Sequence, residues 1–362
     1  MNENSENKKK SQIFEGRIKE FEAIIIQYHL EKANFSEQSD TLALIMAYLS
    51  IHVKLTQNQL KELTKFSIST ISTSLSLLIN TRYVNKEKIS KSHEYLYFTA
   101  YDYNDSLDDV LGSLSTEIDF FKLKIKELIN SNNKEKKGFK LLLNRITEAL
   151  QLFELYNKIL KTIQDPNTPY EIENYEDQKI TVSEEELEII VDGFDPEIKK
   201  IENAIIDFFL YHSVYSILKK FALIIDVFFI TRKVLTQEEI RDLTGLSFGK
   251  VSEVLNKLIK INYIELLKKN ELKDLLPEEL KRKKIYILKS IKYSFMMKGV
   301  SSMREILKWE TKFETIKSEL ENNQKLKTLR GYNEIYRSVN TFLNVVPIYK
   351  KAYNIFIKFI EK

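Results

Sequence analysis

A segment of 30 residues occurs twice in this chain of 362 residues, and this duplication restricts the possible folds most strongly. Residues 55–84 read LTQNQLKELTKFSISTISTSLSLLINTRYV, and residues 235–264 align with them without a gap at a shift of 180. About a third of the aligned positions are identical. A repeat of such a long period indicates two duplicated domains rather than a solenoid of small units.

The start of each repeat carries the signals of a helix N-terminus. Thr56 can cap a helix, and Gln59 three residues later completes a capping box. Leu55 and Leu60 occupy the two positions of a hydrophobic staple. The second repeat has the same cap and staple in Thr236, Glu239, Leu235 and Ile240. Because the device recurs at equivalent places, it predicts a short helix in both repeats.

A turn and a second helix follow in each repeat. Residues 64–66 and 244–246 form the predicted turns, and Gly245 suits the left-handed conformation that such a turn needs. Ser67 and Ser247 are the predicted caps of the second helices. Helical spacing is kept by the apolar residues Ile71, Leu75, Leu78 and Ile79, and by Val251, Leu255, Leu258 and Ile259. The pattern therefore predicts a helix-turn-helix in each half.

The polar face of each second helix is the candidate functional surface. In the first repeat it comprises Ser69, Thr70, Ser72, Thr73 and Ser76, and in the second Gly249, Lys250, Ser252, Glu253, Asn256 and Lys257. Short polar side chains at the start of a helix suit the major groove of DNA, where hydrogen bonds to base edges read sequence. We add Gln57, Ser67, Gln237 and Ser247 to the predicted contacts. The alternative is an ordinary solvated or protein-binding face.

A polar tip and a β-prone run follow each second helix, as in a β-hairpin. The first tip spans residues 85–93 and precedes a predicted strand at 94–99, while the second spans 268–284, contains Pro277 and precedes a strand at 285–288. The basic residues that we expect on DNA phosphates are Lys86, Lys88 and Lys91, and Lys281, Arg282, Lys283 and Lys284. Residues 265–292 contain nine bases and five acids, an excess that phosphate contacts need.

This order of elements resembles the MarR superfamily of winged helix-turn-helix transcription regulators, in particular its GbsR-like branch. The resemblance covers most of each half, including the long helices predicted after each hairpin. It implies a DNA-binding regulator with recognition helices in the major groove and wings on the phosphate backbone. Members of the family are usually single-copy chains that dimerise, and the duplication departs from that pattern. It implies that the two copies pair within one chain, as a monomeric pseudo-dimer, or that the chain forms a homodimer.

The predicted fold class is mainly α with small β wings, in two tandem winged-helix domains related by a pseudo-two-fold. We expect a disordered tail at 1–15, a first repeat with its C-terminal helices at 16–164, a linker at 165–196 and a second repeat at 197–362. Residues 171–197 contain eleven acids and one lysine, a net charge of −10, which leaves 4 − (−10) = +14 on the rest. The linker is predicted to be a solvated acidic spacer, with a short strand at 180–182 and a short helix at 183–191.

Long helices with apolar seams are predicted after each hairpin. The first seam comprises Leu111, Leu114, Ile118, Phe121, Ile125 and Leu128, and its counterpart Ile306, Trp309, Phe313, Ile316 and Leu320. The last helix carries Tyr332, Ile335, Val339, Phe342, Val346, Tyr349, Tyr353, Phe356 and Ile360, and Pro347 is expected to kink or split it. These seams are interpreted either as plain core and pairing surface or as the walls of a pocket for a small-molecule effector.

Composition argues against several other classes of protein. The chain has no cysteine, so it has neither disulfides nor a thiolate metal site. Its apolar runs are too short to span a bilayer, and its start lacks the apolar core of a signal peptide, so we predict a cytoplasmic protein without membrane contact. The four histidines are scattered, and neither a glycine-rich phosphate loop nor an H-E-x-x-H motif is present. The sequence therefore predicts a non-enzyme without cofactor or metal.

A protein-interaction scaffold is the competing function, because tandem winged helices also serve as scaffolds that do not read DNA. Neither recognition helix contains an arginine, and the second one mixes lysine with glutamate. The sequence identifies neither an operator nor an effector, and it does not distinguish a repressor from an activator.

Overall fold

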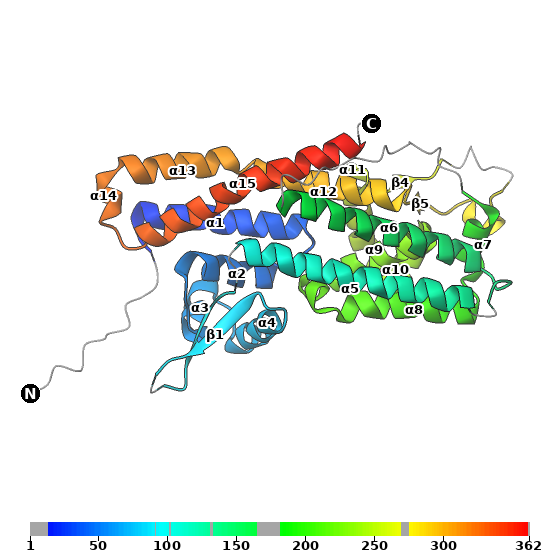
Figure 1. Ribbon diagram of the computed structural model, residues 1–362, viewed down its shortest axis with the longest axis horizontal. Helices are drawn as coiled ribbons and strands as arrows, with labels where there is room; N and C mark the ends of the chain where they lie inside the picture. Colours follow the sequence, from blue (N-terminus) through cyan, green and yellow to red (C-terminus); the bar gives the residue numbers. More distant parts are fainter. Residues whose placement is uncertain are drawn as a thin grey trace, which may run out of the picture. The chain divides into compact units, whose positions relative to one another are not determined.

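The computed structural model describes residues 14–90, 92–100, 103–130, 133–164, 182–268 and 275–360, without the side chains of 103–110, 213 and 214. Within these ranges the chain is mainly helical with small antiparallel sheets, as the sequence predicts (Figure 1). It divides into two compact units, Met1–Asp102 with Glu305–Pro347, and Tyr103–Arg304 with Ile348–Lys362. The units differ from the sequence repeats, because each one combines segments from both halves of the chain.

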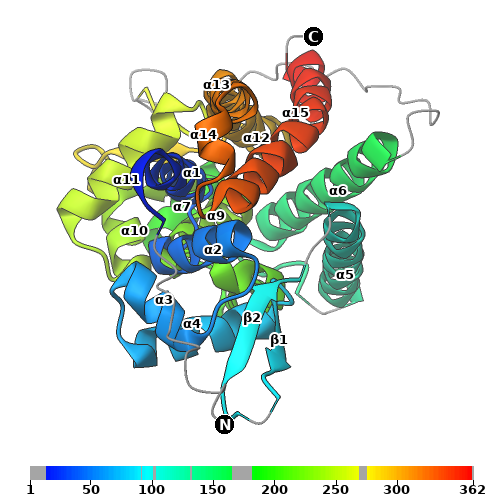
Figure 2. The same ribbon diagram turned by 90° about the vertical axis from the view of Figure 1, so that its left-hand side faces the viewer.

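The first unit begins with four helices and a hairpin: α1 (Gly16–Phe35), α2 (Asp40–His52), α3 (Gln57–Thr64), α4 (Ile68–Asn80), β1 (Val84–Lys88) and β2 (Tyr95–Thr99). The hairpin is antiparallel, with Val84 opposite Thr99, and Leu55 adds one bridge to Tyr97. Figure 2 shows this hairpin next to α4. The second half of the chain contributes α13 (Glu310–Asn322), α14 (Gln324–Lys327) and the start of α15 (Tyr332–Ile360).

An aromatic cluster joins α1 to these helices from the second half. The ring of Tyr28 lies 5.8 Å from that of Trp309, 5.4 Å from that of Phe313 and 4.9 Å from that of Phe342, in edge-to-face arrangements. Such pairs are favourable beyond the apolar area that they bury. The seam predicted in the second half is therefore buried against the first repeat.

A backbone contact reinforces this packing. The Nη2 atom of Arg337, on α15, donates to the carbonyl oxygens of Ser50 and Ile51 at 2.9 and 3.1 Å. These carbonyls lie in the last turn of α2, where no later amide of the helix is available to bond them. The arginine thus satisfies a helix end of the other repeat.

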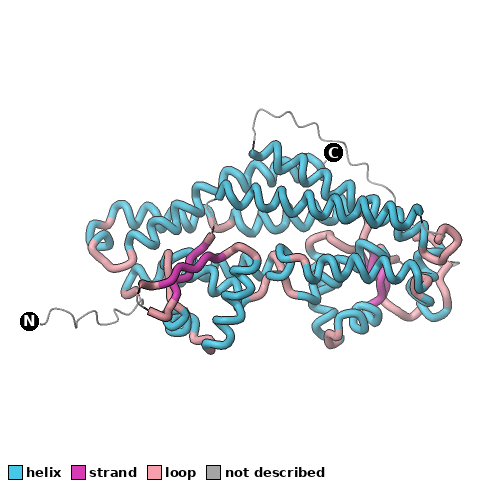
Figure 3. Tube along the Cα trace, turned by 60° about the horizontal axis from the view of Figure 1, so that its bottom comes forward, coloured by secondary structure: helices cyan, strands magenta, loops and turns pink. Residues whose placement is uncertain are grey.

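The second unit contains the remaining elements: α5 (Tyr103–Asn130), α6 (Phe139–Gln164), α7 (Glu184–Asp192), α8 (Pro196–Tyr211), η1 (Ser213–Ile217), α9 (Lys220–Arg232), β3 (Val234–Thr236), α10 (Gln237–Thr244), α11 (Phe248–Lys260), β4 (Glu265–Leu266), η3 (Glu278–Leu280), β5 (Ile285–Ile287) and most of α12 (Ile291–Leu307). The sheet has the order β3-β5-β4 and is antiparallel. Figure 3 shows in magenta how little of the chain is in strands. Leu235 pairs with Tyr286 where Leu55 bridges Tyr97 in the first unit.

In this unit, too, helices from one repeat pack against the other repeat, an arrangement that we call the exchange of helices. Phe121 of α5 and Phe153 of α6 lie 6.1 and 6.3 Å from the ring of Phe209 on α8, which belongs to the second repeat. The buried Arg145 of α6 donates to the carbonyls of Phe229 and Ile230, in the last turn of α9, at 3.1 and 2.9 Å. Long helices of the first repeat therefore cover the second repeat.

Each unit also buries one carboxyl group with its hydrogen-bonding partner at equivalent positions of the duplication. In the first unit the Oε1 atom of Glu22 lies 2.6 Å from Nε2 of His52, and both side chains are buried. In the second unit Glu202, 180 residues later, accepts two hydrogen bonds of 2.8 Å from Arg232. Because a buried polar group without a partner is costly, these contacts fix how α1 meets α2 and how α8 meets α9.

The predicted linker is partly a structural element. Residues 165–181, including most of the predicted short strand, lie outside the described residues, and Val182 is not in a strand. The predicted short helix is confirmed as α7, capped by Ser183. Leu187 of α7 is buried with Val234 and Leu280, and Glu186 forms an ion pair of 2.8 Å with Lys233. For residues 182–196 the prediction of a solvated spacer is therefore wrong, because the apolar positions of α7 cover the sheet.

Two further predictions need correction. Of the predicted tail, residues 1–13 lie outside the described residues, but Phe14 is buried and its ring stacks on that of His52 at 4.5 Å. Of the two effects predicted for Pro347, the split is wrong, because α15 runs without interruption to Ile360, and the kink stays a prediction. The buried stripe shifts beyond the proline to Ala352, Phe356 and Phe359, because α15 passes there into the second unit.

The helix that carries the second seam is also divided. It was expected to match α5, but it is interrupted at residues 308–309 between α12 and α13. The division between the compact units falls at Glu305, just before this break. The five seam residues of the sequence analysis are nevertheless all buried.

We predict that Glu202→Gln lowers the free energy of unfolding by roughly 3–5 kcal/mol at neutral pH, because Arg232 loses its buried counter-charge. Burial raises the pKa of Glu202, but the hydrogen bonds and charges of Arg232 and Lys199 outweigh it and hold the pKa below its ordinary value. The contribution is thus present above the unfolded-state pKa and is lost as the pH falls through the folded-state pKa.

Urea unfolding between pH 7 and pH 3 would measure this difference, with the exposed Glu135→Gln as the control. The difference in the free energy of unfolding between the wild type and Glu202→Gln should shrink as the pH falls. Glu135→Gln should have the free energy of unfolding of the wild type at every pH. A difference for Glu202→Gln that stays constant with pH would contradict an ionised Glu202.

Candidate nucleic-acid interface

The two short helices that begin the repeated segment are fixed by the predicted capping boxes. The amide of Gln59 donates to Oγ1 of Thr56 at 3.2 Å, and the amide of Thr56 donates to Oε1 of Gln59 at 2.8 Å. The second repeat has the same pair of bonds between Thr236 and Glu239, at 3.1 and 2.8 Å. Both predictions are confirmed, and they show that local sequence sets where α3 and α10 begin.

The turn between the two helices is also the same in both units. Gly245 ends α10 with a φ of 70°, as predicted, and Lys65 ends α3 with a φ of 63°. A side chain in the left-handed region is uncommon, so Lys65 is held there by the surrounding turn. The sequence analysis assigned no function to this exposed lysine, although it lies two residues before the cap of α4.

Apart from the exposed Ile68 at its first position, the outer face of α4 carries short, polar and uncharged side chains. Ser67 caps the helix by accepting from the amide of Thr70 at 3.1 Å, and the hydroxyls of these two residues lie 2.9 Å apart. Of the other predicted contacts, Ser69, Thr73 and Ser76 are exposed and Ser72 is half-buried. The structure therefore leaves most of this predicted face accessible.

The surface of α11 is charged, and one of its lysines is paired within the helix. Ser247 caps the helix by accepting from the amide of Lys250 at 3.3 Å. The ammonium group of Lys250 forms an ion pair of 2.8 Å with Glu253, which lowers the pKa of this exposed carboxyl. Gly249 and Asn256 are exposed, and Ser252 and Lys257 are half-buried.

The two predicted glutamines have partners inside the protein. Gln57 donates from Nε2 to the hydroxyl of Tyr97 at 3.1 Å, and so joins α3 to the hairpin. Gln237 donates to the carbonyl oxygen of Phe248 at 3.4 Å, and so joins α10 to α11. Both glutamines thus also position the second helix or the hairpin, and their contacts with DNA stay a prediction.

The described cations of the first hairpin are accessible. Lys86 and Lys88 are exposed, with Lys86 5.0 Å from the ring centroid of Tyr95, and Lys91 lies outside the described residues. Sequence analysis missed Arg82, an exposed residue with a φ of 61° between α4 and β1. The signal that could have identified it is its place at the end of the repeated segment, directly before the basic hairpin tip.

In the second unit, half of the basic cluster is neutralised. Lys281 forms an ion pair with Glu278, and Lys283 forms one of 2.7 Å with Glu238, which raises the pKa of the lysine. Arg282 and Lys284 are exposed and have no ion pair with any described residue. Surface pairs of this kind are weak, so the two paired lysines can exchange partners at a modest cost.

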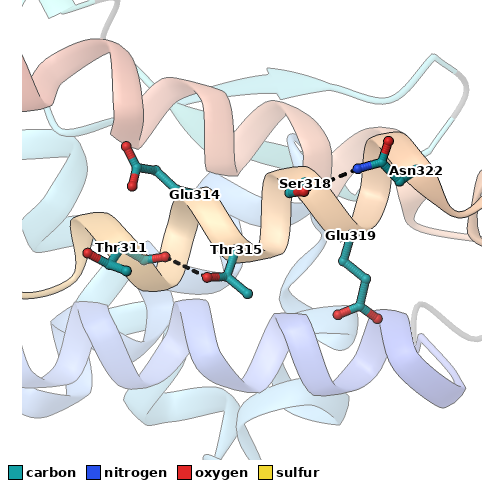
Figure 4. A pocket seen from close by; sticks show the side chains of 6 residues that line it. All are labelled: Thr311, Glu314, Thr315, Ser318, Glu319 and Asn322. Carbon is teal, nitrogen blue, oxygen red and sulfur yellow. Dashed lines mark hydrogen bonds between the residues drawn. The ribbon is translucent and has the colours of Figure 1, made fainter.

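A hollow on the first unit is lined by polar residues of α13 alone: Thr311, Glu314, Thr315, Ser318, Glu319 and Asn322 (Figure 4). Glu319 forms an ion pair of 2.6 Å with Arg17. Thr315 donates to the carbonyl of Thr311, and Asn322 donates to Ser318. The lining thus consists of hydroxyl, amide and carboxyl side chains, and one of its two carboxyl groups is engaged with Arg17.

The described ranges contain no group of three or more histidine, aspartate or glutamate side chains that could hold a metal ion. Among the described helices, none combines the length and apolar character needed to cross a membrane. No protein-family model matches the sequence, and no curated protein matches it.

We predict that Thr56→Ala and Thr236→Ala each lower the free energy of unfolding by about 1 kcal/mol or more, because each removes a cap that satisfies a helix amide. The loss should be larger for Thr236, whose hydroxyl is buried and also bonds Glu239. Urea unfolding measures the effect. The exposed Thr73→Ala serves as the control and should cost nothing, because alanine is the better helix former. Equal losses for all three variants would rule out a specific role of the caps.

Proposed function

We propose that this chain is a sequence-specific regulator of transcription that binds double-stranded DNA through two winged helix-turn-helix heads. In each head the second helix, α4 or α11, enters the major groove, and the adjacent hairpin lies on the phosphate backbone. The hydroxyl and amide side chains of these helices contact base edges, and the unpaired cations of the hairpins contact phosphates.

One observation carries the proposal. Both units contain a capped helix, a left-handed turn, a second capped helix with an accessible polar face and an antiparallel hairpin, in the same order. The segment before the first short helix contacts each hairpin at the equivalent leucine, as the isolated bridge from Leu55 to Tyr97 in the first unit and as strand β3, with Leu235 opposite Tyr286, in the second. This order of elements is that of a winged helix, which commonly docks its second helix into DNA.

The exchange of helices supports pairing within one chain. Each compact unit is completed by long helices from the other repeat, as Tyr28 shows with Phe342 and as Phe209 shows with Phe153. A regulator of the MarR type, in its GbsR-like branch, obtains two heads from two chains. We propose that this chain obtains both heads from one polypeptide. Because α4 is uncharged and α11 carries lysine and glutamate, such a pair reads an asymmetric site.

The competing proposal is a scaffold that binds proteins rather than DNA. It is favoured by the complete absence of charge on the α4 side chains and by the acidic partners of Lys281 and Lys283. A surface built for phosphates would be expected to keep its cations free. The two proposals predict different affinities for duplex DNA near physiological salt.

We expect the full-length protein to bind duplex DNA with an affinity that falls steeply with salt, because each neutralised phosphate releases condensed counterions. The double variant Arg282→Ala with Lys284→Ala should reduce the slope of log affinity against log salt by about 1–2 units. Fluorescence anisotropy with a duplex selected from a random pool measures the slope. The matched control is Lys281→Ala with Lys283→Ala, which should change it less, because these lysines already pair with Glu278 and Glu238. No binding to any duplex near physiological salt would favour the scaffold.

We also expect the protein to have the mass of a single chain in solution, and to prefer an asymmetric duplex to either palindrome made from its halves. Two different recognition helices held by one polypeptide are the physical reason. Light scattering gives the mass, and competition between the three duplexes gives the preference. An obligate dimer that binds a perfect palindrome most tightly would overturn pairing within the chain.

A further inference from the structure

A large apolar side chain occupies the first position of both α4 and α11 and remains exposed. Ile68 retains 37% of its accessible surface and Phe248 46%, at equivalent positions of the duplication. Single exposed apolar residues are common on proteins. In this protein, however, the exposed residues that follow on the two helices are not alike, because α4 has no charged residue equivalent to Lys250 or Glu253. The apolar group is the feature that both helices share at this position.

The surroundings of Phe248 keep its ring in place and its neighbourhood open. The guanidinium carbon of Arg241 lies 4.7 Å from the ring centroid, and Gln237 bonds the Phe248 carbonyl. The next residue, Gly249, lies within the first turn of the helix, and a Cβ built there meets nothing within 4 Å. Glycine in a helix costs about 1 kcal/mol relative to alanine, and neither backbone geometry nor packing requires it here. The missing side chain allows a ligand to approach the backbone beside the ring closely.

On α4, the apolar residue at the first position, Ile68, can contribute more to the choice between bases than its polar neighbours can. Its exposed groups Ser69, Thr73 and Ser76 are hydroxyls, which both donate and accept and therefore discriminate weakly between bases. Ile68 can make neither kind of hydrogen bond. In the major groove the one apolar group that a base pair presents is the 5-methyl group of thymine.

We propose that Ile68 and Phe248 contact thymine 5-methyl groups, so that each head requires a thymine opposite the start of its second helix. This inference rests on the proposed function and adds the base that each head selects. The contact is apolar on both sides and removes the methyl group and the side chain from water together. The first residues of a recognition helix are those that contact base edges in the major groove, which is the position of both side chains.

Replacing thymine by uracil tests the proposal, because it removes the methyl group and leaves base pairing unchanged. The probe is the duplex that the full-length protein selects from a random pool, synthesised with each thymine changed singly to deoxyuridine. At one position in each half-site we expect binding to weaken about fourfold, the equivalent of ~0.8 kcal/mol for one buried methyl-sized group. Equal affinity for every thymine and uracil duplex would overturn the proposal while leaving DNA binding intact.

Variants assign the effect to the two side chains. Ile68→Ala should abolish the discrimination between thymine and uracil in one half-site, and Phe248→Ala should abolish it in the other. Leu123→Ala, at a residue of α5 with 51% of its surface exposed, is the matched control and should keep both discriminations. Circular dichroism confirms that each variant is folded. Discrimination between thymine and uracil that persists in Ile68→Ala and Phe248→Ala would overturn the assignment. If the unaltered protein bound no duplex, the proposed function itself would be wrong, and the two exposed side chains would instead be expected to contact a protein.

Discussion

The cores of both units depend on apolar helices that one repeat supplies and the other repeat needs. The ring of Tyr28 packs on Phe313 and Phe342, and the ring of Phe209 packs near Phe121 and Phe153. A helix with an apolar stripe must bury it against another element, and a single repeat would leave such stripes open to water. The two halves of the chain are therefore required together for either unit to be complete.

Polar contacts determine which helix packs against which repeat, a choice that apolar surfaces alone do not make. Arg337 and Arg145 bond the last carbonyls of α2 and α9, groups that a helix leaves without partners at its end. The buried carboxylates of the duplicated first helices then bind a histidine in one unit and an arginine in the other. Because such groups are costly to bury without partners, they disfavour other pairings of the same helices. The proposed pairing of two heads in one chain relies on this specificity.

Those parts of the candidate interface that depend on neighbouring residues could be predicted from the sequence. The contacts between residues far apart in the chain could not be predicted. Ser67 and Ser247 cap their helices as predicted, because a cap needs only the amides that follow it. Lys283 meets Glu238 from another element, and this loss of a free cation has no signal in sequence spacing. Gln57 likewise bonds Tyr97, forty residues away, a contact that sequence spacing does not indicate.

The sequence by itself determined the duplication, the helical periods, the two capping boxes and the left-handed turn at Gly245, because each follows from residues within a few positions of one another. The tertiary structure alone decided which helix covers which repeat, that α7 packs on a sheet, and that α15 continues through Pro347. An apolar stripe specifies that it must be buried, but every stripe in the chain offers similar surface. The choice among partners follows from shape and from the few buried polar groups, which act over distances that sequence spacing does not record.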